Sequence, residues 1–385
     1  MRFADNRNKI GKYIPAVVFL IFIYGMALWF IFSPKPDYSS SEKRYLQKFP
    51  EVTAEKLLSG DFGSEFETFF ADRFPQRNTW VGLNAYTALA EGNNGASGVY
   101  NCKNGYLINK PVSTENNLDK NIGAVADFAK SIDTPTTVML VPSTGYIVDD
   151  VLPTFHDKYN DDEDISKISS TLSKDKIAFV DLRERFKSEY KNGSQIYYKT
   201  DHHWTTKGAY TGYQELCKAL GITPIDDSTL KKDSYPDFYG TTYSSSGFWL
   251  TPPDNIEIWN NPKNSDRNIS VKITEGANIK TSGSMYFTDH LKEDDKYPVF
   301  IDGNHALTEI TNTNAKNGTI LLIKDSFSHS LAPFLAENYS KVVLVDLRYY
   351  KESVSDLVTT YNPEQVVVLY GIDNLATDTD IVWLK

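Results

Sequence analysis

The sequence predicts a three-layer α/β/α fold, in which helices cover both faces of a mostly parallel sheet. One observation is a series of strand-length apolar runs without polar alternation, at residues 136–142, 319–323, 342–345 and 366–370. Strands buried on both faces of a parallel sheet have this composition. The other observation is a pair of polar turns, around Asp201 and Ser326, each of which separates a strand pattern from a helix pattern. Such junctions are where α/β proteins place their chemistry.

The N-terminal segment predicts a membrane anchor. Residues 1–12 carry four basic side chains and one acidic side chain, and residues 14–32 are almost wholly apolar. This run matches the roughly 20 residues that cross a bilayer. A cleaved signal peptide has a shorter apolar core, of about 7–15 residues, and a small-residue cleavage site, which residues 30–34 do not offer. We expect a cytoplasmic tail (1–12), an uncleaved transmembrane signal-anchor (13–33) in the cell membrane, and an extracytoplasmic remainder.

Residues 34–95 are predicted to form a linker and a helical collar. The linker is rich in proline, serine and charge, and residues 52–80 show an amphipathic helical pattern with many phenylalanines. The spacing of polar residues in this segment indicates no catalytic chemistry. We expect the collar to pack on the main domain.

Residues 96–385 are predicted to form the catalytic domain. In chain order we expect strands at 105–108, 136–142, 177–182 and 195–199, and helices at 117–132, 183–191 and 209–220. Residues 226–297 lack helical periodicity and are predicted to be an inserted loop-and-β segment beside the site, with strands at 256–259 and 269–273. Four further strands are expected at 299–301, 319–323, 342–345 and 366–370.

The composition narrows the functional class. The chain has 40 basic and 50 acidic residues and a formal net charge of -10, so it is not built to bind nucleic acid by bulk electrostatics. The aromatic fraction of 13% suits either an ordinary core or carbohydrate contact. Cys102 and Cys217 lack metal-site spacing, and whether they form a disulfide is left open by the sequence.

The residues Asp201 to Trp204 and the turn at Ser326 predict a nucleophilic triad. In an extended segment the side chains at i and i+2 point the same way, so Asp201 and His203 can face one site while His202 points elsewhere. A serine hydroxyl attacks an acyl carbon when a neutral imidazole takes its proton and a carboxylate orients that imidazole. We expect Ser326 as nucleophile, His203 as general base and Asp201 as its orienting carboxylate.

An oxyanion needs hydrogen-bond donors. The candidates are the backbone amide at or next to Ser326, Asn304 near the predicted strand 299–301, and Arg348 after the strand 342–345.

Purely structural roles are the alternative for the three residues of the predicted triad. Ser326 would then cap a strand end, Asp201 would cap the helix that begins near residue 205, and His203 would be a core histidine.

The sequence Asp201-His202-His203-Trp204 is the signature of the bacterial DHHW protein family, and the chain resembles that family over roughly residues 45–375. The family in turn resembles the alginate O-acetylation proteins, whose catalytic domains are SGNH-hydrolase-like. Further blocks that carry the likeness are residues 70–77, 105–107, 141–143, 152–153, 238–240, 246–247, 303–304, 324–327, 346–350 and 370–374.

This resemblance implies an SGNH-like fold and acetyl transfer to an exopolysaccharide or cell-wall glycan. In the alginate proteins an Asp-x-His pair precedes the nucleophilic serine, and Asp201, His203 and Ser326 fit that order. Trp204 and Tyr349, which lie in matching blocks, are implied to contact substrate. The acceptor would be a polysaccharide, the acetyl group would come from a membrane-bound O-acyltransferase partner, and no cofactor or metal would be needed.

Three other functions use the same residues. A carbohydrate esterase would pass the acyl group to water. A metallophosphoesterase would use Asp201 to His203 and Gly303 to His305 as ligands, but it needs more Asp/His clusters than the remaining histidines provide. A catalytically silent glycan-binding or scaffold protein would use the aromatic segment 235–259 as its binding surface.

Overall fold

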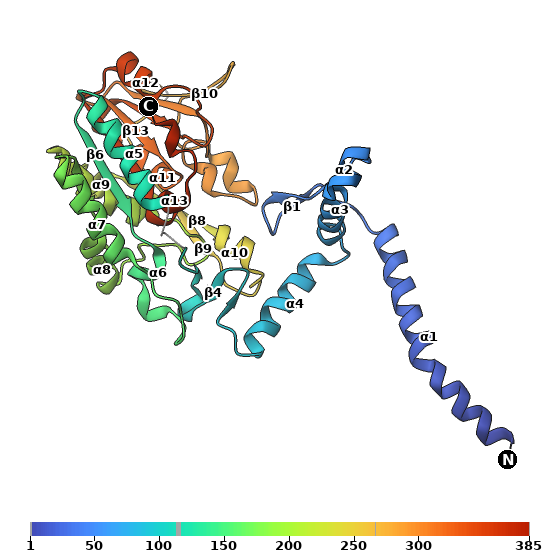
Figure 1. The fold of residues 1–385 in the computed structure, drawn as a ribbon. Coiled ribbons are helices and arrows are strands. Elements are labelled where there is room, and N and C mark those ends of the chain that lie inside the picture. The colour runs from blue at the N-terminus through green and yellow to red at the C-terminus, as the bar shows by residue number, and fades with distance from the viewer. Residues whose placement is uncertain (1, 113–116, 266, 385) are drawn as a thin grey trace. The chain divides into compact units, whose positions relative to one another are not determined.

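The computed structural model describes residues 2–112, 117–265 and 267–384. The chain divides into two compact units, with the boundary between Tyr86 and Thr87. In Figure 1 the first unit is drawn in blue shades, and the second runs from cyan to red.

The first unit begins with the long helix α1 (Arg2–Phe32). Its segment Tyr13–Phe32 has a mean hydropathy of 2.4 and is long and apolar enough to cross a membrane. An apolar helix near the N-terminus can be a membrane anchor or part of a signal sequence, so the orientation of α1 and its location in the cell membrane stay predictions.

The rest of the first unit contains a small hairpin, β1 (Tyr38–Ser39) and β2 (Arg44–Tyr45), and the helices α2 (Ala54–Ser59) and α3 (Asp61–Asp72). Helix α4 (Arg77–Ala90) begins in this unit and ends in the next. The helical pattern expected at residues 52–80 is therefore present as three helices. Gly60, with a φ of +87°, separates the first two because an L side chain rarely adopts this conformation. Buried Asp72, in the block at residues 70–77, accepts two hydrogen bonds from Arg44 and so has a structural role.

The second unit is organised around an eight-stranded sheet with the order β11-β10-β12-β14-β13-β15-β6-β7. The five strands from β14 to β7 are parallel to one another, whereas β12, β10 and β11 extend the sheet beyond β14 in antiparallel fashion. The strand bounds are β6 (Thr136–Val141), β7 (Ala178–Asp181), β10 (Ile269–Glu275), β11 (Asn278–Ser282), β12 (Leu307–Asn312), β13 (Asn317–Lys324), β14 (Tyr339–Val345) and β15 (Gln365–Gly371). The predicted α/β fold with a mostly parallel sheet is confirmed.

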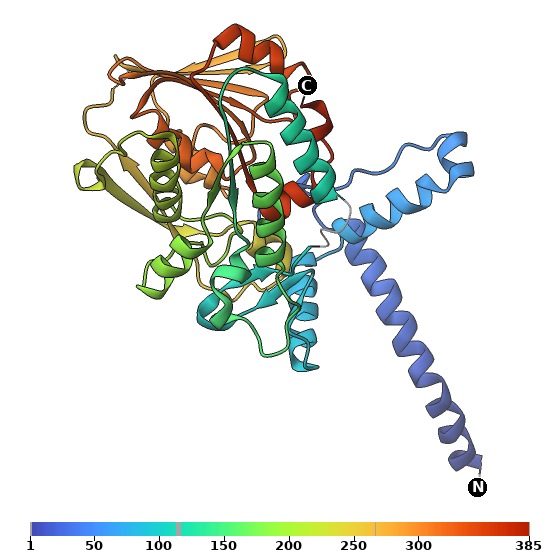
Figure 2. The same cartoon turned by 60° about the vertical axis from the view of Figure 1, so that its left-hand side comes forward.

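Alternate side chains of the parallel strands enter two different hydrophobic cores. In β13, Ile320 and Leu322 belong to one core, and Leu321 and Ile323 belong to the other. The first core is completed by α9 (Thr206–Leu220) and α11 (Ser328–Leu335), and the second by α5 (Asn117–Ser131), α7 (Asp161–Lys174), α12 (Val354–Tyr361) and α13 (Ile372–Thr377). In Figure 2 the teal helix α5 and the olive-green helix α9 lie on opposite sides of the sheet. This two-sided burial explains why the strands lack polar alternation.

Smaller elements surround this sheet. A three-stranded sheet is formed by β3 (Gly95–Ala96), β4 (Val99–Asn101) and β5 (Leu107–Asn109), and a separate pair by β8 (Lys231–Phe238) and β9 (Asp254–Asn260). The remaining helices are α6 (Thr144–Ile147), α8 (Arg183–Lys191) and α10 (Thr241–Ser246). The strands expected at 256–259 and 269–273 are both present, and the second belongs to the central sheet.

The prediction of a strand at residues 299–301 is wrong. Tyr297–Val299 form a turn of 3-10 helix, and Ile301 and Asp302 have positive φ values of 49° and 66°. The apolar triplet is buried as core without pairing into the sheet. The strand in this region is β12, in which buried polar residues such as Glu309 and Asn312 interrupt the apolar pattern.

The prediction of a strand at residues 195–199 is also wrong. The segment forms only an isolated bridge between Tyr197 and Trp204. Its apolar and aromatic side chains are buried as anchors, and the Tyr197 hydroxyl donates a hydrogen bond to the Pro142 carbonyl at 2.5 Å. Asp201 therefore lies in a hairpin-like loop before α9, not at the end of a sheet strand.

Candidate active site

The polar residues of the site gather where parallel strands end. Ser143 follows β6, Ser326 follows β13, Asp346 follows β14 and Asp373 follows β15. Since parallel strands place their carboxyl ends on one edge of the sheet, residues far apart in sequence become neighbours there.

Ser326 lies on a short turn between β13 and α11, as the sequence predicts. The preceding residue, Asp325, holds this turn. One of its carboxylate oxygens accepts a hydrogen bond from the Phe327 amide at 3.0 Å, and the other accepts from the Gly371 amide at 2.8 Å and from Asn374 Nδ2 at 2.7 Å. Burial raises the pKa of Asp325, and these three donors act in the opposite direction. The nucleophile turn is thus tied to the end of β15.

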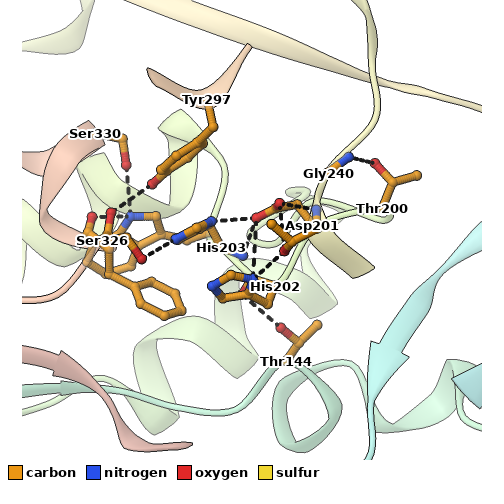
Figure 3. Close-up of polar contacts among 12 residues, drawn as sticks. Thr144, Thr200, Asp201, His202, His203, Gly240, Tyr297, Ser326 and Ser330 are labelled. Atoms are coloured by element: carbon orange, nitrogen blue, oxygen red, sulfur yellow. Dashed lines mark hydrogen bonds and ion pairs between the residues drawn. The ribbon is translucent and has the colours of Figure 1, made fainter. Parts of the chain in front are cut away.

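His203 connects Ser326 to Asp201 (Figure 3). His203 Nε2 lies 2.7 Å from Ser326 Oγ, and His203 Nδ1 lies 2.5 Å from Asp201 Oδ1. Because an ionised carboxylate only accepts hydrogen bonds, Nδ1 carries the proton and the lone pair of Nε2 faces the serine hydroxyl. Burial alone would raise the pKa of Asp201, but the adjacent imidazoles of His203 and His202 and several hydrogen bonds hold it well below its usual range. The structure brings together the three residues predicted as a triad.

Two aromatic rings fix the imidazole of His203. Tyr297 stacks on it with a centroid distance of 4.1 Å and an interplanar angle of 10°, and Phe327 meets it edge-on at 5.0 Å. The Tyr297 hydroxyl donates a hydrogen bond to the Ser326 carbonyl at 3.2 Å. His203 and Ser326 therefore share one packing partner, Tyr297.

The loop that carries Asp201 is held by side chains from the segment around β8 and β9. Asp201 Oδ2 accepts a hydrogen bond from the Thr241 amide at 2.7 Å. Asp254 accepts from the amides of Lys199 and Thr200 and from the Thr200 hydroxyl. A Cβ atom on Gly240 would lie 2.1 Å from the Cβ of Asp201, so this close approach requires glycine. No spacing in the sequence indicated these partners.

The prediction that His202 points away from the site is wrong. Its ring lies against that of His203 with a centroid distance of 3.9 Å, and its Nδ1 is 2.6 Å from Thr241 Oγ1. The prediction assumed an extended segment, whereas the loop turns tightly here. Loss of solvent around the ring, followed by the neighbouring His203, lowers the pKa of His202 to about 4, so the ring is neutral near pH 7.

The resemblance implies that Trp204 contacts substrate, but its side chain is fully buried in this structure. Its indole N–H lies 3.0 Å from the Phe327 carbonyl and 2.9 Å from Ser330 Oγ. The resemblance marked Trp204 correctly as a family residue, but its place is behind the nucleophile turn, where it joins the Asp201 loop to α11.

Asn304, Arg348 and Tyr349 lie together at the end of β14. Arg348 donates to Asp346 at 2.8 Å and 2.6 Å and to Asn304 Oδ1 at 2.9 Å, and its guanidinium lies 5.6 Å from the Tyr349 ring centroid. Asn304 and Tyr349 are exposed. Within the described part of the chain, no hydrogen bond joins these three residues to Ser326 or His203. The donor with a direct place at the nucleophile is the Ser326 amide, for which the described residues offer no intramolecular acceptor.

A buried charged network lies behind the nucleophile. The ammonium group of Lys324, which is 2% exposed, lies 2.8 Å from Asp346 Oδ2 and 2.9 Å from His329 Nε2. Burial lowers the pKa of Lys324, and the Asp346 charge counteracts it. Burial and the adjacent Lys324 keep the pKa of His329 well below its usual range. The sequence pattern could have identified Lys324 as a buried residue, because it ends a strand that has no polar alternation. A buried lysine needs a buried partner.

A pocket adjoins the nucleophile turn. We call it the Ser143 pocket; it is lined by β5, by the segments that follow β6 and β15, and by His202 and Phe327. The Ser143 hydroxyl donates to Asp373 Oδ1 at 3.1 Å, and the Ser143 amide donates to buried Asp161 at 2.7 Å. Burial and mutual repulsion raise the pKa of Asp373 to about 7, and burial raises the pKa of Asp161 to about 6. The sequence showed Ser143 only as part of a family block.

Asp201, His202 and His203 could also offer a metal ion one ligand atom each, and these atoms lie within 4.8 Å of one another. In the structure, however, Asp201 Oδ1 and His203 Nδ1 are hydrogen-bonded to each other, and His202 Nδ1 contacts Thr241. A cation would have to replace these contacts, so the donor set fits the triad better.

The two cysteines, Cys102 and Cys217, are buried and free. Burial raises the pKa of each thiol to about 12, so both stay protonated near pH 7. Neither thiol lines the Ser143 pocket or contacts a residue of the triad in the described part of the chain.

Comparisons with known proteins agree with this architecture. A family model described as DHHW protein matches residues 103–345. No curated protein sequence gives a significant match.

Several solved structures are similar to the chain. A DHHW family protein from Eubacterium siraeum DSM 15702 has 18% identity and a TM-score of 0.63, with coverage of 75% of this chain and 95% of that chain. PatB1 of Bacillus cereus with a sulfonyl adduct has 20% identity and a TM-score of 0.61, with coverage of 74% and 97%. A second structure of Bacillus cereus PatB1 has 20% identity and a TM-score of 0.59, with coverage of 71% of this chain and 96% of that chain. At these identities the likeness shows a shared fold.

Proposed function

Because the chain belongs to the DHHW protein family and aligns Ser326, His203 and Asp201 in one hydrogen-bonded line, we propose that it is a serine-dependent O-acetyltransferase acting on a glycan. The observation that carries the proposal is the 2.7 Å contact between Ser326 Oγ and His203 Nε2. A silent binding protein has no need for a serine hydroxyl at the lone pair of an oriented imidazole, so this contact favours an enzyme.

The first half-reaction forms an acetyl-serine. Ser326 Oγ attacks the carbonyl carbon of the acetyl donor while His203 Nε2 takes the hydroxyl proton. The bond between the acetyl carbon and the donor's leaving group then breaks, and the leaving group receives the proton from His203. Asp201 stays ionised and stabilises the imidazolium, because its pKa lies well below its usual range.

The second half-reaction transfers the acetyl group to a sugar. A sugar hydroxyl loses its proton to His203 Nε2 and attacks the acetyl carbon, after which the bond to Ser326 Oγ breaks and the serine regains a proton. In both halves the carbonyl oxygen becomes an oxyanion. The free Ser326 amide, next to the N-terminus of α11, is the donor that we assign to it.

We place this reaction outside the cytoplasm, on an exopolysaccharide or cell-wall glycan. The support is the apolar segment Tyr13–Phe32, which suits a signal-anchor that leaves the following chain extracytoplasmic. A membrane-bound O-acyltransferase partner would deliver the acetyl group across the membrane. Transfer of the acetyl group to water instead of sugar would make the protein a carbohydrate esterase.

The proposal is tested with the full chain in detergent. The protein is incubated with p-nitrophenyl acetate, with and without neutral oligosaccharides, and acetyl-enzyme is followed by intact mass. We expect one acetyl adduct, located on Ser326 by peptide mapping, that is absent from Ser326→Ala. Faster decay of the adduct on addition of sugar, with acetylated sugar as product, identifies a transferase.

A matched control is Ser328→Ala, which removes a fully buried hydroxyl that has no hydrogen-bond partner among the described residues. This variant should keep the adduct. A folded wild-type protein that forms no adduct on Ser326 would contradict the proposal, and decay to free acetate alone would assign the esterase activity.

A further inference from the structure

The Ser143 pocket lies beside the reacting atoms. Phe327, which lines the pocket, directly follows Ser326, and His202 lines it from the other side. The rings of both residues lie against the His203 ring, with centroid distances of 5.0 Å and 3.9 Å. Figure 3 shows His202 and Thr144 on the opposite side of the His203 ring from Tyr297. A sugar held in this pocket would lie against the two side chains, His202 and Phe327, whose rings contact His203.

The pocket carries polar groups that suit hydroxyls. Ser143 and Asp373 form a hydrogen-bonded pair on one wall. On the other wall lies His202, whose Nδ1 is 2.6 Å from the Thr241 hydroxyl behind it, and this hydroxyl lies 3.1 Å from Asp201 Oδ2. If this hydroxyl donates to the carboxylate, His202 Nδ1 must donate to Thr241 Oγ1, which leaves Nε2 of the neutral imidazole as a hydrogen-bond acceptor. A hydroxyl can donate to this nitrogen, whereas a carboxylate cannot.

The charge of the pocket selects against acids. None of its lining residues in the described part of the chain is a lysine or an arginine, whereas Asp373 is a carboxyl group. A second carboxyl, Asp161, lies directly behind Ser143 and is 3% exposed. Burial raises the pKa of both acids, as expected where no cation compensates them. A uronate would bring a further negative charge into this poorly solvated space without a partner.

The pocket also has apolar walls. Leu107, Val141 and Ile372 contribute aliphatic walls, and Tyr159 contributes an aromatic wall. Tyr159 approaches so closely that a Cβ on Gly145 would lie 2.2 Å from its ring. Mixed apolar faces with a few convergent polar groups are typical of small-ligand sites.

We propose that the Ser143 pocket is the acceptor subsite and that it binds an uncharged sugar unit and excludes uronates. This inference rests on the proposed acetyl transfer, and it names the substrate class: a neutral hexose or N-acetylhexosamine residue of the glycan. Its hydroxyl gives its proton to His203 Nε2 and attacks the acetyl carbon, and Ser326 Oγ leaves.

The test compares two acceptors on the same acetyl-enzyme. The full chain in detergent is acetylated with p-nitrophenyl acetate, and the rate of adduct decay is measured with neutral oligoglucosides or N-acetylglucosamine oligomers and with oligouronates of equal length. We expect the neutral sugars to be acetylated about tenfold or more faster than the uronates. In Asp373→Asn, which removes the carboxyl charge and keeps the shape, the preference should fall several-fold.

The control variant is Asp127→Asn on α5, whose carboxyl is 80% exposed, and it should leave the ratio of the two acceptors unchanged. Equal transfer to both sugar classes, or an unchanged ratio in Asp373→Asn, would overturn the subsite. A binding arm uses Ser326→Ala and saturation-transfer NMR with the same sugars. Neutral sugars should bind this variant and oligouronates should not. If the wild type forms no acetyl adduct, the proposed acetyl transfer fails, while the binding arm still decides which sugar class the pocket takes.

Discussion

The two halves of the candidate triad are held in different ways. The Ser326 turn continues a central strand, and its backbone is tied to β15 through Asp325. The Asp201 loop belongs to no strand, and its position depends on side chains and a glycine contributed by residues 240–254. Ser326 is thus placed by the sheet, whereas His203 is placed by a peripheral segment.

The contrast indicates where the site is sensitive to substitution. Sheet ladders are cooperative and hard to shift by one substitution, whereas a loop held by a few hydrogen bonds moves when one acceptor is lost. The 2.7 Å contact between His203 and Ser326 needs both halves in place. Four predictions, in order of decreasing effect, separate the contributions of the turn and the loop.

The greatest loss is expected from Asp201→Asn in the loop. The amide would favour the wrong imidazole tautomer, so the rate of acetyl-enzyme formation should fall by about three to four orders of magnitude. The rate is measured by intact mass, and circular dichroism checks the fold. A loss of less than tenfold in a folded variant would remove Asp201 from the triad.

In the turn, Lys324→Met should destabilise the fold by about 3 kcal/mol. The substitution leaves Asp346 with Arg348 as its charged partner and leaves His329 Nε2 without the ammonium group. Denaturant unfolding measures the change. The control is Lys341→Met on β14, where a half-exposed lysine pairs with Glu309 at 3.7 Å and should contribute less than about 1 kcal/mol. Equal effects of the two substitutions would show that the buried network does not stabilise the turn.

In the loop, Asp254→Ala should cost about 2 kcal/mol of unfolding free energy, because two backbone amides and the Thr200 hydroxyl lose their acceptor. The rate of acetyl-enzyme formation should fall by about ten- to a hundredfold, since the base loses its register. Asp254→Asn keeps one oxygen and should recover part of both losses. A normal rate in a destabilised Asp254→Ala protein would mean that the loop holds its position without Asp254.

The least effect concerns acid stability. The pKa of Asp201 is lower in the folded chain than in the unfolded chain, so its contribution to stability is fully present above the unfolded pKa of about 3.9 and is lost as the pH falls toward the folded value. The stability difference between wild type and Asp201→Asn should therefore shrink on acidification below about pH 4. Melting temperatures between pH 7 and 3 measure this difference. A difference that grows on acidification would mean that folding raises the pKa of Asp201.

Much of the fold was predictable because it depends on local pattern. The apolar runs at β6, β13, β14 and β15 identified the buried parallel strands, since both faces of each strand enter a core. The segments 195–199 and 299–301 contain apolar and aromatic residues that are buried in loops. Strand β12 was missed because it carries polar residues that pair inside the fold. Composition reports burial, and burial is not confined to strands.

Local sequence patterns were enough to select the three residues of the candidate triad. Asp201, His203 and Ser326 stood out because an Asp-x-His pair and a serine after an apolar strand are local features. The folded chain was needed to show that His203 and Ser326, 123 residues apart, lie within hydrogen-bonding distance. It also revealed that Trp204 is buried, and that His202 and Asp373 line the Ser143 pocket, whose described lining residues include no lysine or arginine. The physical reason is that contact, burial and charge environment arise from packing between distant segments, which no short pattern records.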